Sequence, residues 1–300
     1  MLTLVALLLL LLPEVMMPRP VDLPAVATDS VELERLAVRM GPARLLKLLQ
    51  KPSPGDKGRV ALTALRGLAL AGAQHPEMAA QSVLPLTELL EQTSDEKLRQ
   101  AISDTLLRLC QVLGHSMHCD EADDLGCGGD PGALPPRLLA LAEKPSLPAL
   151  TRSVAISALQ ALPVARWQTL SPRLFALAQR EPAPLRTAVL AALSALHQQA
   201  ARPELLTLVA QPDDSLAAAA SQELCWPLTL QKPPRSQPVV AAVALVPESV
   251  LIRVRAIAAG QQPIAVRLQT VDCLRVAGAP ADKALLLQLA AAAKLAKSRR

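Results

Sequence analysis

A helix-packing pattern of small residues and leucines recurs along this chain and constrains its fold more than any other feature. It is clearest in Arg152–Leu162 (RSVAISALQAL) and Arg186–Leu196 (RTAVLAALSAL), whose starts lie 34 residues apart. Each segment has Ile or Leu four residues after its Arg, Ala after six, and Leu after seven and ten. Self-similarity at this spacing indicates stacked helical pairs, none of which can bury its apolar face alone.

The composition agrees with an all-α fold. Apolar residues make up 51% of the 300 residues, whereas aromatic residues make up 1%. Alanine lets helices approach closely and leucine fills the remaining space, but a β-sandwich would need more β-branched and aromatic residues. The chain also has no Asn and more Arg than Lys. We interpret this bias as the mark of a GC-rich, bacterial genome rather than of a function.

Leucines at the position seven residues after the Arg mark successive units. These anchor leucines are Leu65, Leu106, Leu159, Leu193, Leu224 and Leu274. They predict about six antiparallel helical pairs, with a loop insertion at residues 114–132. The predicted pairs are 42–50 with 57–71, 78–92 with 96–113, 136–143 with 148–162, 171–179 with 183–199, 203–210 with 214–225, and 248–259 with 263–276, followed by a last helix at 283–298. The proline-rich segment 231–238 is expected to separate a regular array (28–230) from a C-terminal repeat and cap (239–300).

Three segments carry a family resemblance. Leu-Thr-Arg152, Pro-Leu-Arg186 and Ala-Val-Arg267, each with its following leucines, resemble the second helix of bacterial-type HEAT repeats. The resemblance covers most of residues 40–280, although Gly58 and Ala217 replace the Arg in two other units. It implies an α-solenoid of HEAT or armadillo type that binds a protein partner along a concave face lined by the second helices. Arg152, Arg186 and Arg267 are then candidates for that surface. From its residue type, Trp226 is a candidate aromatic anchor.

The N-terminal segment 1–27 resembles an export signal. Leu2–Leu12 is apolar apart from Thr3, but it is too short to span a membrane. Ala25-Val26-Ala27 then supplies a small-x-small cleavage site. We therefore expect a periplasmic or extracellular protein, and a cytoplasmic one if the segment is not a signal.

The insertion concentrates candidate chemistry, and three interpretations of it stay open. In an exported protein, Cys119 and Cys127 can form a local disulfide. Alternatively, His115, His118, Cys119 and Cys127 supply a zinc ligand set, though without a paired Cys-x-x-Cys spacing. The third interpretation is an acidic loop without a ligand. Among the other cysteines, Cys110 and Cys273 are expected to be small unpaired core residues, whereas Cys225 near a helix end is open.

No catalytic motif occurs in the sequence, and we expect neither enzymatic activity nor a cofactor. Residues 28–130 carry 11 Lys or Arg against 15 Asp or Glu, whereas residues 131–300 carry 19 against 9. A non-catalytic protein-interaction scaffold is the leading hypothesis. The first alternative is a cytoplasmic nucleic-acid-binding solenoid that uses the basic half, although scattered cations without interleaved aromatic residues disfavour it. The second is a HEAT-like lyase or a metal-dependent enzyme at residues 115–130.

The C-terminal tail is basic and has no apolar run long enough to cross a membrane. We expect it to make at most a weak contact with an anionic surface, through Lys294, Lys297, Arg299 and Arg300.

Overall fold

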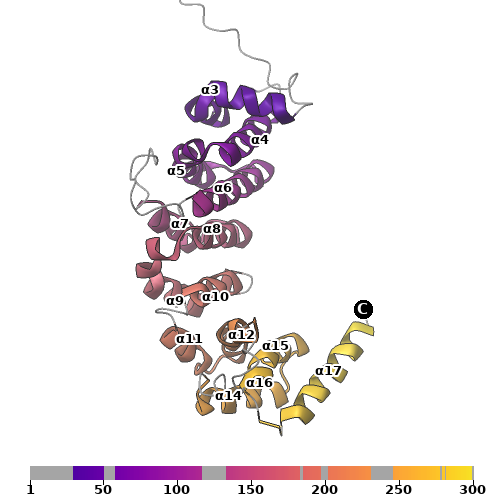
Figure 1. Cartoon of the computed structure of the whole chain (residues 1–300). Coiled ribbons are helices and arrows are strands. Elements are labelled where there is room, and N and C mark those ends of the chain that lie inside the picture. The colour runs from indigo at the N-terminus through magenta and orange to yellow at the C-terminus, as the bar shows by residue number, and fades with distance from the viewer. Residues whose placement is uncertain are drawn as a thin grey trace, which may run out of the picture.

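In the computed structural model, the described part of the chain is almost entirely helical (Figure 1). It describes residues 30–50, 58–116, 133–182, 185–196, 202–230, 246–277, 279–280 and 282–298. No strand occurs within these ranges, so the all-α prediction is confirmed.

The helices from α3 to α12 alternate between two sides of an elongated array (Figure 1). One side holds α3 (Ser30–Gln50), α5 (Pro76–Gln92), α7 (Leu134–Glu143), α9 (Ser171–Arg180) and α11 (Arg202–Val209). The other side holds α4 (Arg59–Gln74), α6 (Glu96–Ser116), α8 (Ala149–Ala161), α10 (Leu185–Leu196) and α12 (Asp214–Leu230). Each of these latter five helices contacts the next, and together they form one row. We call this the second-helix row.

The C-terminal part follows α12 and packs against it. It comprises α14 (Glu248–Ala259), α15 (Ile264–Leu268), α16 (Val271–Ala277) and α17 (Asp282–Ser298). Contacts of α12 with α14, α15 and α16 join this part to the second-helix row. Helix α17 touches α14, α15 and α16 and lies at the end of the array (Figure 1).

The anchor leucines form the interior, as their spacing predicts. All six are at most 2% exposed, and the residues that precede four of them (Ala64, Ala158, Ala192 and Cys273) are fully buried. A small residue beside a leucine at each contact lets neighbouring helices approach, while the leucine fills the space between them.

Short-range signals fix several helix ends. The Asp95 carboxylate accepts a hydrogen bond from the Leu98 amide (2.9 Å), and the Asp213 carboxylate accepts two from Ser215 and Leu216 (2.9 and 3.1 Å). These bonds satisfy amides that a helix start leaves without partners. Helices α6 and α12 therefore begin close to the predicted positions 96 and 214.

The first helix is longer than the sequence analysis predicts. Helix α3 begins at Ser30, and the predicted start at Pro42 is instead a kink at Gly41, which has a φ of 72°. The added turns are held by packing, because Leu33 and Ala37 are buried and both lie against Gly67 of α4. This contact joins two helices, so the sequence pattern around Pro42 could not predict it.

Two other boundaries need correction. The insertion predicted at 114–132 begins later, because α6 continues through Ser116. Gly114 is buried, and a Cβ atom added there would lie 1.8 Å from the carbonyl oxygen of Ala161 in α8. Only glycine permits this approach of the two helices. The helix predicted over 263–276 is interrupted between α15 and α16, where the Thr270 hydroxyl donates to the Arg267 carbonyl (2.7 Å).

Candidate functional site

Arginines near the start of the second helices bind the carboxyl ends of the preceding helices. In each case the guanidinium Nε donates to a backbone carbonyl that the helix end leaves without an intrahelical partner. The four bonds are Arg99 to Thr93 (3.2 Å), Arg152 to Ala142 (2.6 Å), Arg186 to Glu181 (2.8 Å) and Arg267 to Ala258 (2.8 Å). These arginines therefore stabilise the turn within four of the helical pairs.

Ion pairs then join one helical pair to the next. Arg152 Nη2 lies 2.7 Å from Glu181 Oε1, and both side chains are nearly buried, at 8% and 10% exposed. The other links between pairs are Glu91 with Arg137 (3.1 Å) and Lys144 (3.0 Å), Glu143 with Arg173 (3.0 Å), Asp213 with Arg186 (3.4 Å), and Asp214 with Arg253 (2.6 Å). Many Lys and Arg residues of the basic half, residues 131–300, are thus paired with carboxylates of the same chain.

The three arginines predicted at the binding surface make their contacts within the chain. Arg152 is buried, while Arg186 and Arg267 are partly buried with their Nε atoms bonded to carbonyl oxygens. We therefore leave them out of the candidate binding surface. The backbone of Trp226 belongs to α12, but its side chain lies outside the part of the chain that the structure describes.

An elongated groove of about 1040 Å³ lies between α4 and α6 on the second-helix row. We call it the α4–α6 groove. Its apolar lining includes Leu62, Leu65, Ala69, Leu70, Ala73, Ala101 and Val112. Leu62 is 40% exposed, and so this floor is open to an incoming apolar side chain. The sequence analysis does not identify the groove, because it depends on how α4 packs beside α6, and these helices are not consecutive in the chain.

Polar side chains flank the groove floor. They are Arg66 from α4 and Asp104, Arg108, Gln111 and His115 from α6. His115 Nδ1 lies 2.7 Å from the carbonyl oxygen of Gln111, and the Asp104 carboxylate accepts a hydrogen bond from Gln100 (2.9 Å). No ion pair joins Arg66 or Arg108 to an acidic side chain among the described residues. Arg66 and Arg108 differ in this respect from the arginines that link the helical pairs, each of which is paired with a carboxylate.

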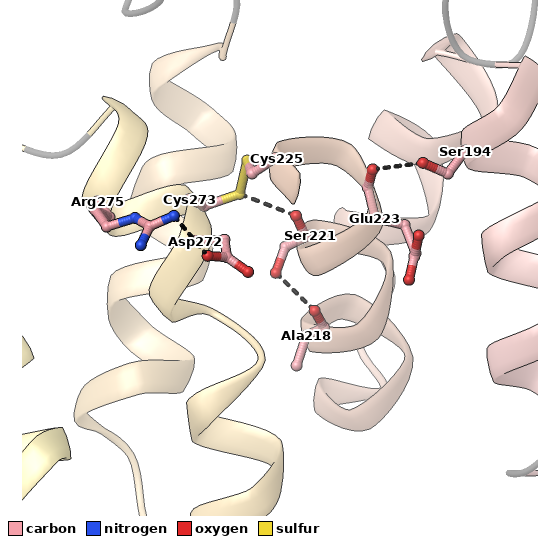
Figure 2. Close-up of a disulfide and its surroundings, with 8 residues drawn as sticks. All are labelled: Ser194, Ala218, Ser221, Glu223, Cys225, Asp272, Cys273 and Arg275. Atoms are coloured by element: carbon pink, nitrogen blue, oxygen red, sulfur yellow. Dashed lines mark hydrogen bonds and ion pairs between the residues drawn. A yellow bond between two sulfur atoms is a disulfide. The ribbon is translucent and has the colours of Figure 1, made fainter. Parts of the chain in front are cut away.

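A disulfide joins α12 to α16 (Figure 2). It links Cys225 with Cys273 across 48 residues, and both residues are fully buried. The Cys273 sulfur also lies 3.1 Å from the carbonyl oxygen of Ser221. The expectation that Cys273 is an unpaired core residue is therefore wrong, because the fold brings Cys225 next to it. Its buried position, by contrast, is as predicted.

Of the three remaining cysteines, the structure describes Cys110 only. Cys110 is free and buried, as predicted, and burial raises the pKa of its thiol to about 12. It is therefore protonated and unreactive near neutral pH. Cys119, Cys127 and His118 lie outside the described residues, so the local disulfide and the zinc set both stay predictions. His115, the described member of that set, is exposed at the end of α6.

Glu223 lies two residues before Cys225 in α12, and its side chain is on the side of the helix away from the disulfide (Figure 2). Burial raises the pKa of its carboxyl group above the usual range. The nearby Ser194 hydroxyl donates to the Glu223 backbone carbonyl (2.9 Å) and so links α10 to α12. We find no nucleophile beside this carboxyl among the described contacts, and we assign it no catalytic role.

The described ranges hold neither a candidate metal site nor a candidate membrane-spanning helix. No group of three or more His, Cys, Asp or Glu side chains there could hold a metal ion. None of the helices in those ranges has both the length and the apolar character needed to cross a membrane. Of the predicted basic tail, Lys294 is exposed on α17, whereas Arg299, Arg300 and the side chain of Lys297 lie outside the described residues.

Comparison with known proteins does not assign the chain to a family. No family description matches the sequence, and no curated protein matches it.

Proposed function

We propose that this chain is a HEAT-like α-solenoid that acts as a non-catalytic scaffold and binds a protein partner along its second-helix row. The observation that carries the proposal is the α4–α6 groove, an open apolar surface on that row. The recurrence of buried anchor leucines and of arginine-capped helix ends supports the solenoid. Such arrays bind through extended surfaces rather than through one enclosed pocket.

Export remains part of the proposal. The Cys225–Cys273 disulfide supports an oxidising compartment, because disulfides persist in secreted and periplasmic proteins and are rare in the cytosol. The predicted signal segment, residues 1–27, lies outside the described residues.

The nucleic-acid alternative is less well supported. It requires a continuous row of free cations, since phosphate contacts dominate such binding. Arg137, Arg152, Arg173, Arg186 and Arg253 are instead paired with carboxylates of the same chain. No observation favours the enzymatic alternative at residues 115–130, most of which lie outside the described ranges.

Site-specific photo-cross-linking tests the proposal. A photoreactive residue at Ala73 or Gln111, both exposed in the groove, should yield an adduct with one partner in the native host. The same residue at Glu88, exposed on α5 on the other side of the array, is the matched control. The purified partner should then bind the full chain with defined stoichiometry in calorimetry. Absence of groove-specific adducts, or equal adducts from Glu88, would refute the proposal.

A further inference from the structure

The α4–α6 groove has the length of a short helix. On α6 its lining runs from Ala101 to His115, which is about 21 Å at 1.5 Å per residue. On α4 it runs from Leu62 to Ala73, about 16 Å. A segment of three to four helical turns would fill it, whereas a globular surface would contact only its rim.

The chemistry of the floor favours a helix over an extended segment. The lining side chains all come from α4 and α6, whose backbone groups are bonded within the helices. An extended peptide would therefore place its own amides and carbonyls against leucine and alanine side chains without partners, at a large cost. A helix satisfies its backbone internally and presents only side chains, so it fits an apolar groove of this kind.

The charges at the groove indicate what kind of helix it would bind. Arg66 and Arg108 are exposed and lack an ion-pair partner among the described residues, and the lining holds one carboxylate, Asp104, against these two cations. By contrast, the cations that join one helical pair to the next, such as Arg137 and Arg173, form ion pairs with carboxylates of the same chain. Acidic side chains beside the apolar stripe of a bound helix would complement Arg66 and Arg108.

From these observations we infer that the α4–α6 groove binds an amphipathic, acidic helix of a partner protein, three to four turns long. This inference rests on the proposed scaffold function and names the chemistry of the partner. The leucines of the bound helix lie on the floor around Leu62 and Leu70. Its Glu or Asp residues flank that stripe and pair with Arg66 and Arg108.

Synthetic helices provide the test. One peptide of about 18 residues carries Leu at helical spacing and Glu on both flanks, a second has Lys in place of every Glu, and a third has the first peptide's composition in scrambled order. Binding to the full chain is measured by fluorescence anisotropy at low salt. The Glu helix should bind at least about tenfold more tightly than either other peptide, because it alone has both the stripe and the complementary charge.

Variants of the full chain then locate the binding. Arg66→Glu/Arg108→Glu should reverse the preference in favour of the Lys helix, and Ala73→Trp should block binding by filling the groove. Arg166→Glu, an exposed arginine outside the groove, should leave the affinities unchanged. All these positions are exposed, so the folded state should persist, and circular dichroism checks this.

The outcomes separate the two proposals. Equal binding of the Glu and Lys helices, binding of the scrambled peptide, or a preference that survives the double charge reversal would overturn the acidic-helix inference. The scaffold proposal would still stand if cross-linking at Ala73 and Gln111 captured a partner whose purified form binds. If no groove-specific adduct formed, the scaffold proposal would fail first.

Discussion

Breaking the Cys225–Cys273 disulfide should lower the stability of the folded chain by a predictable amount. The bond closes a loop of 48 residues between α12 and α16. In the chain-entropy description, a loop of this length restricts the unfolded chain by about 4 kcal/mol. With a urea m-value of about 3 kcal/mol/M, the unfolding midpoint should fall by about 1.3 M on reduction.

The measurement compares oxidised and reduced wild-type protein, because the two differ only in the bond itself. Both sulfurs are buried, so reduction is carried out in denaturant before refolding. If mass analysis shows Cys225–Cys273 as the one disulfide, the Cys225→Ala/Cys273→Ala variant should unfold at the same urea concentration with and without reductant. Cys110→Ala, which removes the buried free thiol, is the matched control and should stay as sensitive to reductant as the wild type.

Two results would refute this reasoning. The first is alkylation of all five cysteines in denatured, non-reduced protein, since no disulfide would then exist. The second is a midpoint that moves by less than about 0.3 M on reduction, which would mean that the loop contributes little. Intact mass also tests the insertion, because three alkylated thiols indicate one disulfide and one indicates two. Peptide mapping of the alkylated cysteines then distinguishes Cys225–Cys273 from Cys119–Cys127.

Other predictions concern the contacts within and between helical pairs. Arg152→Met should destabilise the fold by about 3 kcal/mol in urea unfolding, since it removes the bond to the Ala142 carbonyl and leaves the nearly buried Glu181 with only the 61% exposed Arg180, whereas Arg275→Met, at an ion pair whose arginine is 60% exposed, should cost less than about 1 kcal/mol. A hydrogen bond from Arg152 lowers the pKa of Glu181 from its usual range, so Glu181 stabilises at pH 7 and loses this effect as the pH falls through its folded pKa. Glu181→Gln should therefore be less stable than wild type at pH 7, and the difference should shrink as the pH falls through that pKa. Burial raises the pKa of Glu223, and Glu223→Gln should accordingly be more stable than wild type at pH 7, with the gain lost below about pH 4.5; parallel urea curves across pH check both signs. Gly114→Ala should cost about 3 kcal/mol or more because its Cβ would meet the Ala161 carbonyl at 1.8 Å, while Gly67→Ala, which meets Ala37 Cβ at 3.2 Å, should cost much less; equal thermal stabilities of the two variants would contradict this difference.

The helical pairs could be predicted from the sequence because their signals are local. Apolar periodicity, the carboxylates of Asp95 and Asp213, and prolines near helix starts all act within a few residues. The anchor leucines are buried in the structure for the same reason, since a residue's place on a helix face follows from its spacing. The early start of α3 departs from the prediction because contacts with α4 hold the added turns, whereas the break after α15 accompanies a local hydrogen bond from Thr270 to the Arg267 carbonyl.

The candidate groove, the disulfide and the roles of the arginines were decided only by tertiary structure. The composition shows that residues 131–300 are basic, but it does not show that Arg152 and Arg186 form ion pairs with Glu181 and Asp213 of the same chain. Likewise, five cysteines allow many pairings, and only the packing of α12 against α16 brings Cys225 to Cys273. The physical reason is the same in each case. A helix depends on interactions between residues four apart, whereas ion pairs, disulfides and grooves depend on distances between helices that lie far apart in the chain.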